Sequence, residues 1–495
     1  MTRAVRSVLP LLALAGCSMA PDYRPPATVA IPASFKEAPG WSPATPTDAS
    51  TRGPWWSLFG DPVLDGLERR VAVTNQNVAA ARAAYQAARA LVVVQRSQLF
   101  PTVTASASGQ RSGSFAGGPA TGVNTGTGVG VGTGTGTGLN GYTGSGSRFA
   151  LGIGESWEPD LWGRLGNAVT QAKANAQASA GDLANATLSA QGELATDYID
   201  LRGIDAQRVL LDTVIKDYTR ALTITTNQYK AGTVAHSNVY QAQSTLSSAV
   251  AQRQTLDQQR ATLEHAIAVL VGENPSSFAV TPANWTPTVP DIPGIVPATL
   301  LQRRPDIASA ERKVAAANAN IGIQRAAYFP QITLTGSQNT SGTAIGQLFS
   351  AATSLWSFGL SGLMTLLDFG ARHGQVLEAR AQYDEAVATY RQTVLTAFQQ
   401  VEDYLAATRV LADVTQSRAT AATAATQAER IIDNQYLSGI VDYSQVIVAQ
   451  TNSLTARQNQ IQAVVNQQTA AIALVQAIGG GWTTDTLSAP PAAAP

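Results

Sequence analysis

The chain contains the same long segment twice, and this internal duplication constrains its fold more than any other feature. Two motifs mark each repeat: Gln-Arg followed by Phe-Pro, and Gln-Tyr followed by Gly and later by Ala-Gln. The first motif stands at 95–101 and again at 324–330, and the second at 228–243 and again at 435–450. The repeat is too long for a solenoid, whose units span about 20–50 residues. The sequence therefore predicts one large structure that has been duplicated and fused.

The first repeat contains two segments in which apolar residues alternate with small ones, at 102–108 and 149–153. Alternation with a period of two predicts strands. The Gly- and Thr-rich stretch 112–147 lies between these segments, so we interpret it as the tip of a hairpin, with a flexible linker as the alternative. We expect the first hairpin at about 101–158.

The second repeat alternates in the same way at 332–335 and 356–361, so we expect a second hairpin at about 330–367. Four strands with one apolar face are typical of part of a transmembrane barrel, whose outside contacts lipid and whose inside contacts water. Four strands cannot close a barrel, and open edges are not tolerated in hydrocarbon. Copies of the chain must complete it. A dimer would supply eight strands and a trimer twelve, and the residues alone do not choose between them.

Most of the remaining chain consists of long segments rich in Ala, Gln, Arg, Leu and Thr, which favour helices. We expect helices over 62–99, about 165–229, 237–272, about 298–328, 374–436 and 442–478. In the second of these, apolar residues recur three, four or seven apart from Leu194 to Leu222, as in a coiled-coil contact interrupted by Arg208. That helix is roughly 98 Å long at 1.5 Å per residue, so it must cross a compartment or project far from a membrane.

The N-terminus resembles a bacterial export signal that ends in a lipid-attachment site. Leu14–Cys17 is similar to the lipobox of bacterial lipoproteins, in which the chain is cut before the cysteine and the thiol is acylated. We expect removal of 1–16 and a lipid on Cys17, with an ordinary signal peptide as the alternative. Ser18 follows the cysteine where an Asp would retain many lipoproteins at the inner membrane, which by analogy implies delivery to the outer membrane.

The composition excludes several functions. The 33 basic and 33 acidic residues cancel, and only 13% of residues are charged, so a nucleic-acid partner is disfavoured. The chain has one cysteine and three histidines, which leaves few ligands for a metal site. We expect the histidines to be ordinary surface or packing residues. No Ser-His-Asp or paired-carboxylate arrangement is plausible, so we expect no enzyme activity, catalytic residue or cofactor. No later segment offers the roughly 20 apolar residues of a spanning helix, so any membrane crossing must use strands.

Seven motifs follow one another along the chain in a specific order. They are the lipobox, Trp55-Trp56, 58–62, the Phe-Pro pairs ending at Pro101 and Pro330, 157–163, 303–307 with Glu311, and 479–482. In this order and with the duplication, the chain after Cys17 resembles the outer membrane efflux lipoproteins of the TolC/OprM (NodT) type. The resemblance implies an α+β membrane protein, a homotrimer. Its 12-stranded outer-membrane β-barrel, with four strands from each chain, is continuous with a long α-helical periplasmic barrel.

The same resemblance implies the exit duct of a tripartite efflux pump in the outer membrane of a Gram-negative bacterium. Small molecules would pass through it without a covalent step. Its partners would be two further copies of the chain, a periplasmic membrane-fusion adaptor protein, an inner-membrane RND-type pump and outer membrane lipid. A type I protein-secretion conduit has the same architecture and is the alternative. A trimeric coiled-coil surface protein would explain the helices but not the hairpins.

In such channels the periplasmic helix tips close like an iris, and the repeat places the tips at 229–237 and 436–444. The candidate gate residues are Tyr229, Tyr436, Asp442, Tyr443 and Val448. Relatives carry an inward Asp at the position of Val448 and an Arg at that of Thr451, so a gate in this chain must use other contacts. Asp442 and Gln445 also fit a helix-capping arrangement.

The predicted organisation has six parts, with Pro101 and Pro330 as helix–strand junctions. The parts are a signal peptide (1–16), a lipidated tether (17–54), the first repeat (55–274), a Pro-rich connection (275–297), the second repeat (298–482) and a flexible tail (483–495).

Overall fold

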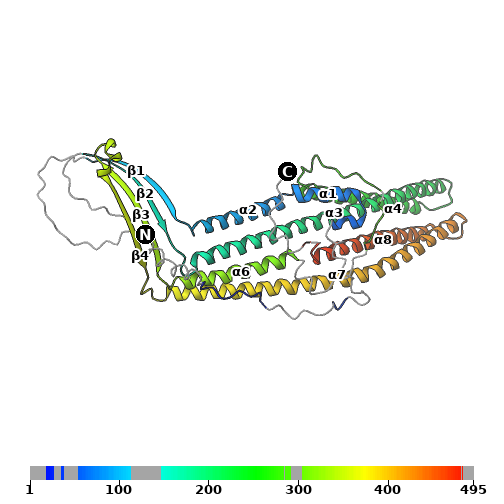
Figure 1. Ribbon diagram of the computed structural model, residues 1–495. Coiled ribbons are helices and arrows are strands. Elements are labelled where there is room, and N and C mark those ends of the chain that lie inside the picture. The colour runs from blue at the N-terminus through cyan, green and yellow to red at the C-terminus, as the bar shows by residue number, and fades with distance from the viewer. Residues whose placement is uncertain are drawn as a thin grey trace. The chain divides into compact units, whose positions relative to one another are not determined.

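The computed structural model describes residues 18–26, 35–37, 54–112, 146–283, 285–290, 304–480 and 482. Within these ranges the chain is mostly helical and contains one four-stranded sheet (Figure 1). Its contacts divide it into unit 1 (Met1–Asp22, Leu91–Gln171 and Asn318–Arg380) and unit 2 (Tyr23–Ala90, Ala172–Ala317 and Ala381–Pro495). None of the described helices is long and apolar enough to cross a membrane. The predicted signal peptide, Cys17 and the C-terminal tail lie outside the described residues.

The sheet belongs to unit 1, and its strands lie in chain order. They are β1 (Thr102–Ser112), β2 (Gly146–Trp157), β3 (Gln331–Gly342) and β4 (Ser354–Leu363). Each strand pairs antiparallel with the next, which confirms the two predicted hairpins and shows that β2 of the first repeat pairs with β3 of the second. Within the described part of the chain, β1 and β4 are the two sheet edges.

The strand register gathers the apolar side chains on one side of the sheet, here called the apolar face. Residues directly opposite one another in antiparallel strands share a face. Trp157 is opposite Leu334, which is opposite Leu360, and Ala105 is opposite Ile153. The face also carries Val103, Ala107, Phe149, Leu151, Ile332, Trp356 and Phe358. Its polar exceptions are Arg111, Ser147, Glu155, Gln338, Thr340 and Ser354. The other face is built mainly from Thr, Ser, Gly and Asn, as expected for a strand with one side in an apolar environment.

Six of the described helices form three pairs of equal length between the two repeats. The described α-helices are α1 (Pro62–Thr74), α2 (Gln76–Ser97), α3 (Arg164–Lys230), α4 (His236–Leu270), α6 (Pro305–Ala326), α7 (Ala371–Leu437) and α8 (Tyr443–Ala477). α2 and α6 have 22 residues each, α3 and α7 have 67 each, and α4 and α8 have 35 each. At 1.5 Å per residue, α3 and α7 are each about 100 Å long. These equal lengths support the duplication predicted from the motifs.

The helix predicted over 62–99 is divided in two at Asn75. The backbone of Asn75 is extended (φ −62°, ψ 126°). Its Oδ1 accepts hydrogen bonds from the backbone N–H groups of Asn77 and Val78 at 3.0 and 3.1 Å, which caps α2. Its Nδ2 donates to the carbonyl oxygen of Leu270 at 2.8 Å, at the end of α4. The prediction of one helix was wrong because a tertiary contact fixes Asn75 outside the helical conformation.

The helix predicted from about 298 begins later. Arg304 is not helical, and α6 starts at Pro305. Proline suits the first position of a helix because it has no N–H to leave unpaired there. Residues 291–303 lie outside the described chain.

The coiled-coil pattern predicted on α3 is buried in unit 2. Leu194, Leu201 and Leu211 are fully buried, and Tyr218 is nearly so. Arg208, which interrupts the pattern, pairs with Asp205 at 3.1 Å and with Asp257 at 2.9 Å. These ion pairs explain how a charged residue is accommodated beside an apolar seam.

Candidate functional site

Two helical hairpins of unit 2, α3–α4 and α7–α8, end in turns of the same construction, here called tip 1 and tip 2. After each long helix a glycine adopts a positive φ, 76° at Gly232 and 73° at Gly439. In both turns the glycine N–H bonds to the carbonyl oxygen three residues earlier, and the next N–H bonds to the carbonyl oxygen five residues earlier. This pair of bonds is the Schellman motif, which needs a left-handed residue where glycine has no steric cost. The two tips therefore fold alike because the repeat conserves one glycine.

An aromatic pair closes each turn from positions that correspond in the two repeats. In tip 1 the rings of Tyr229 and His236 are stacked with centroids 4.3 Å apart, and the ring centroids of His236 and Tyr240 are 4.4 Å apart. In tip 2 the rings of Tyr436 and Tyr443 are 5.6 Å apart. His236 is thus a packing residue, as expected from the sequence.

The tyrosines of tip 2 join it to tip 1. The Tyr436 hydroxyl donates a hydrogen bond to Oε1 of Gln228 at 2.8 Å. Tyr443 is 4% exposed and belongs to an apolar cluster with Ala242 of α4. Burial, together with the neighbouring Tyr436 hydroxyl, raises the pKa of Tyr443, while a hydrogen bond with Thr225 acts in the opposite direction. Two of the predicted gate residues therefore bind α7 and α8 to α3 and α4.

Asp217 of α3 interacts electrostatically with Glu429 and Asp433 of α7 in unit 2, and we refer to these three carboxyl groups as the acidic cluster. Burial raises the pKa values of both Glu429 and Asp433. Repulsion from Asp433 and Asp217 raises the pKa of Glu429 further, and repulsion from Asp217 raises that of Asp433. Ser453 and Gln450 of α8 offset part of this by hydrogen bonding to Glu429 and Asp433, respectively. Sequence reasoning did not identify this cluster. Its signal was the spacing of Glu429 and Asp433, four residues apart and so on one face of a helix.

The remaining gate candidates make fewer contacts. Asp442 is exposed and precedes α8, but its side chain accepts no capping bond. The Gln445 N–H bonds to the Asp442 carbonyl oxygen instead, at 3.0 Å. The predicted capping arrangement was therefore wrong. Val448 is 60% exposed, whereas Thr451 bonds to Tyr218, whose pKa burial raises to about 12.

The two helix–strand junctions of unit 1 each carry a tryptophan hydrogen bond. Pro101 directly precedes β1, and Pro330 directly precedes β3. The Trp157 indole N–H donates to the carbonyl oxygen of Leu99 at 3.0 Å, and that of Trp162 donates to the carbonyl oxygen of Pro330 at 2.8 Å. These bonds fix the chain where each helix passes into the sheet.

The residues that follow Cys17 bind near one of these junctions in unit 1. The Ser18 hydroxyl donates to Oδ1 of Asn167 at 3.0 Å, and Nδ2 of Asn318 donates to the carbonyl oxygen of Pro21 at 2.9 Å. Asn167 lies in the first turn of α3, close after β2. The described chain therefore holds Ser18 near the end of the sheet.

Among the described residues, no group of three or more His, Cys, Asp or Glu side chains could hold a metal ion. The arrangement of the tips offers hydrogen bonds, packing and repulsion between carboxylates, which can hold or release neighbouring helices.

Comparison with known proteins matches most of the chain to one family. Residues 69–273 and 296–480 match the family described as "Outer membrane efflux protein". The probable efflux pump outer membrane protein TtgC of Pseudomonas putida is 29% identical over 476 residues, covering 96% of this chain and 94% of that protein. The outer membrane protein OprJ of Pseudomonas aeruginosa is 28% identical over 487 residues, covering 97% and 96%.

Solved structures show the same fold. The outer-membrane channel OprN is 28% identical with a TM-score of 0.80, covering 94% of this chain and all of that one. The open state of the Neisseria gonorrhoeae MtrE outer membrane channel is 26% identical with a TM-score of 0.80, covering 95% and 100%.

Proposed function

Because the chain belongs to the outer membrane efflux protein family, we propose that three copies assemble into one channel that is gated at tips 1 and 2. The chain is an outer membrane component of an efflux system and not an enzyme. The geometry supports the proposed assembly and gate, and the family supports the proposed partners.

The four-stranded sheet supports the closed barrel. Its two edges, β1 and β4, expose unpaired backbone groups within the described chain, and hydrocarbon does not tolerate such edges. Pairing β4 of one copy with β1 of the next satisfies both. Three copies give twelve strands, with the apolar face toward lipid and the Thr- and Ser-rich face toward the lumen.

The tips support a gate at the C-terminal ends of the long helices α3 and α7. Opening the lumen there requires α7 and α8 to move away from α3 and α4. Such a movement breaks the bond from Tyr436 to Gln228 and the packing of Tyr443 against Ala242. Conduction itself is passive, with the energy supplied by the inner-membrane pump and no covalent step in this chain.

The partners follow from the family. An adaptor protein in the periplasm and an RND-type pump in the inner membrane would supply substrate and energy. The named efflux relatives support efflux over the protein-secretion alternative. A lipid on Cys17 would sit one residue before Ser18, which the structure holds near the end of β2, where a barrel meets the inner leaflet.

Our proposal keeps the six-part organisation, from a signal peptide at 1–16 through two repeats to a tail at 483–495. The equal lengths of α3 and α7 support the two repeats within it.

A planar-bilayer recording of the purified full-length protein tests the channel. We expect discrete conductance steps, and we expect them to increase when a contact between the tips, such as the Tyr436–Gln228 hydrogen bond, is removed. Absence of any conductance from folded, membrane-inserted protein would contradict the proposal.

A further inference from the structure

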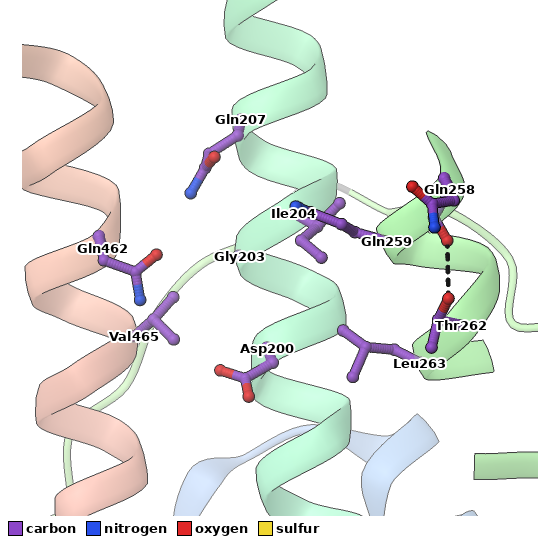
Figure 2. A pocket seen from close by; sticks show the side chains of 10 residues that line it. All are labelled: Asp200, Gly203, Ile204, Gln207, Gln258, Gln259, Thr262, Leu263, Gln462 and Val465. Atoms are coloured by element: carbon purple, nitrogen blue, oxygen red, sulfur yellow. Dashed lines mark hydrogen bonds between the residues drawn. The ribbon is translucent and has the colours of Figure 1, made fainter. Parts of the chain in front are cut away.

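A cavity of about 470 Å³ lies in unit 2 between α3, α4 and α8 (Figure 2). Its volume is within the range of small-molecule sites, about 300–1,000 Å³. Its lining includes Asp200, Ile204 and Gln207 of α3, Leu263 of α4, and Gln462 and Val465 of α8. None of the tip contacts described above involves these residues.

The cavity is lined by both polar and apolar side chains. Figure 2 shows the Asp200 carboxylate and the Gln207 amide directed into the gap between α3 and α8, where Gln462 projects from α8. Ile204 and Leu263 lie on the side of α4. One charged group, several amides and a small apolar surface are what a ligand with a charge and a carbon skeleton requires.

Gly203 shapes the floor of the cavity. A Cβ atom on Gly203 would lie 2.4 Å from Cγ2 of Val465. α3 and α8 therefore approach closely at this point, and the glycine keeps the floor free of a side chain.

The cavity lies on the side of α3 opposite two side chains, Tyr198 and Arg202, that form hydrogen bonds to other parts of unit 2. Tyr198 donates to Asp61 at 2.6 Å, and Arg202 donates to the Thr281 carbonyl oxygen at 2.9 Å. At about 100° per residue, Asp200 and Gln207 lie on the opposite side of the helix from these two residues. The inference below requires this side of α3 to face the lumen of the proposed trimer.

The charge of the cavity is uncompensated. No Lys or Arg is among the lining residues. Burial raises the pKa of Asp200. Burial, with Glu193 and Asp200 nearby, also raises the pKa of Asp197 to about 6. A nearby cation favours the charged form of each of these carboxyl groups.

We propose that this cavity is a subsite for organic cations on the path through the channel, with Asp200 as the charged contact, the glutamine amides as hydrogen-bonding partners and Ile204, Leu263 and Val465 as the apolar contact. This inference rests on the proposed function, because it needs the cavity to open to the lumen. A divalent metal ion fits less well, since it prefers several carboxylate or carbonyl oxygens at short distance. An anion would be repelled by Asp200 and Asp197.

Ethidium, an aromatic monocation, is a suitable probe. Its binding to the full-length protein in lipid nanodiscs is measured by fluorescence anisotropy. We expect saturable binding that Asp200→Asn weakens by about ten-fold or more, the order expected for loss of one hydrogen bond to a charged group. Gln462→Trp, which places a large side chain at the exposed rim, should also weaken it.

Asp212→Asn is the matched control. Asp212 also lies on α3 but pairs with Arg253 at 2.8 Å, so its substitution should leave ethidium affinity within about two-fold. Fluorescein, an anion, should show no dependence on Asp200.

Unchanged ethidium affinity in Asp200→Asn, or no saturable binding by the wild-type protein, would overturn the subsite. Bilayer conductance of the same preparations separates the two proposals. Normal conductance without ethidium binding contradicts the subsite alone, whereas absent conductance contradicts the channel.

Discussion

The hydroxyl of Tyr436 donates a hydrogen bond to Oε1 of Gln228 at 2.8 Å, so the second residue of a Gln-Tyr motif in one repeat binds the first residue of the same motif in the other. The duplicated motif thus contributes twice: its glycine forms each turn, and its polar residues join the two turns. A gate assembled from these tips would depend on contacts between repeats as well as between copies of the chain.

Removing the Tyr436 hydroxyl should loosen the closed gate. Tyr436→Phe keeps the ring packed against Tyr443 but deletes the bond to Gln228. One such bond contributes about 1 kcal/mol, which corresponds to about a five-fold rise in the open fraction. The measurement is the open probability in planar bilayers.

Tyr240→Phe is the control for this substitution. It removes a hydroxyl from Tyr240 of tip 1, which is 62% exposed. The open probability should therefore stay unchanged. An equal effect of both variants would show that the Tyr436 bond does not hold the gate.

Lowering the pH should favour the closed tips. The pKa values of Glu429 and Asp433 are raised by burial and by carboxylate neighbours, so these groups take up protons before an ordinary carboxyl does as pH falls. Protonation of Glu429 and Asp433 removes the repulsion between them and Asp217. At neutral pH, Arg457 of α8 offsets only part of this repulsion at Glu429. We expect open probability to fall as the pH drops, and the fall to begin above the usual pKa values of 4.5 for Glu429 and 3.8 for Asp433.

The double substitution Glu429→Gln and Asp433→Asn should abolish this pH dependence and favour closure at all pH values. A wild-type pH profile in the double variant would assign the effect to other groups.

Replacing Glu68 should stabilise unit 2. Glu68 is fully buried in α1, and neither carboxyl oxygen has a hydrogen-bond partner. Burial, with Asp65 nearby, raises its pKa to about 9. Glu68→Met removes the unpaired group and should raise the free energy of unfolding by about 1–3 kcal/mol. Thermal unfolding followed by circular dichroism is the measurement.

The sign of the pH effect follows from the same shift. The folded chain keeps a proton on Glu68 that the unfolded chain releases above its usual pKa of 4.5. Wild-type stability should therefore fall as pH rises from about 4.5 toward about 9, and Glu68→Met should reduce that slope. Glu264→Met, which removes a carboxylate bonded to Arg260 at 3.0 Å, should instead destabilise the fold. A stabilised Glu264→Met would contradict this reasoning.

The two faces of the sheet should respond differently to charge. Leu360 lies on the apolar face, and its neighbour Ser361 lies on the other face. Leu360→Arg should destabilise the inserted barrel by about 2–4 kcal/mol if the residue lies near the middle of the bilayer. Ser361→Arg should be tolerated, because its side chain would meet water. Folding yields into liposomes compare the two, and equal yields would place the apolar face elsewhere.

Periodicity predicted the strands and long helices well because their patterns repeat over many residues. Asn75 could not be predicted, since its conformation depends on a bond to the Leu270 carbonyl that lies far away in sequence. The tip residues were found through the repeat. Their partners Gln228 and Thr225 were not identified, because a pattern within one helix does not show which residue of another helix it contacts. The cavity at Asp200 depends on three helices meeting and had no signal in any one of them.

The number of chains in the detergent-solubilised full-length protein, measured by native mass spectrometry, tests the central proposal most directly. Our account predicts a mass of three chains, because three four-stranded sheets close a barrel of twelve strands. A single chain or a pair as the only species would contradict it.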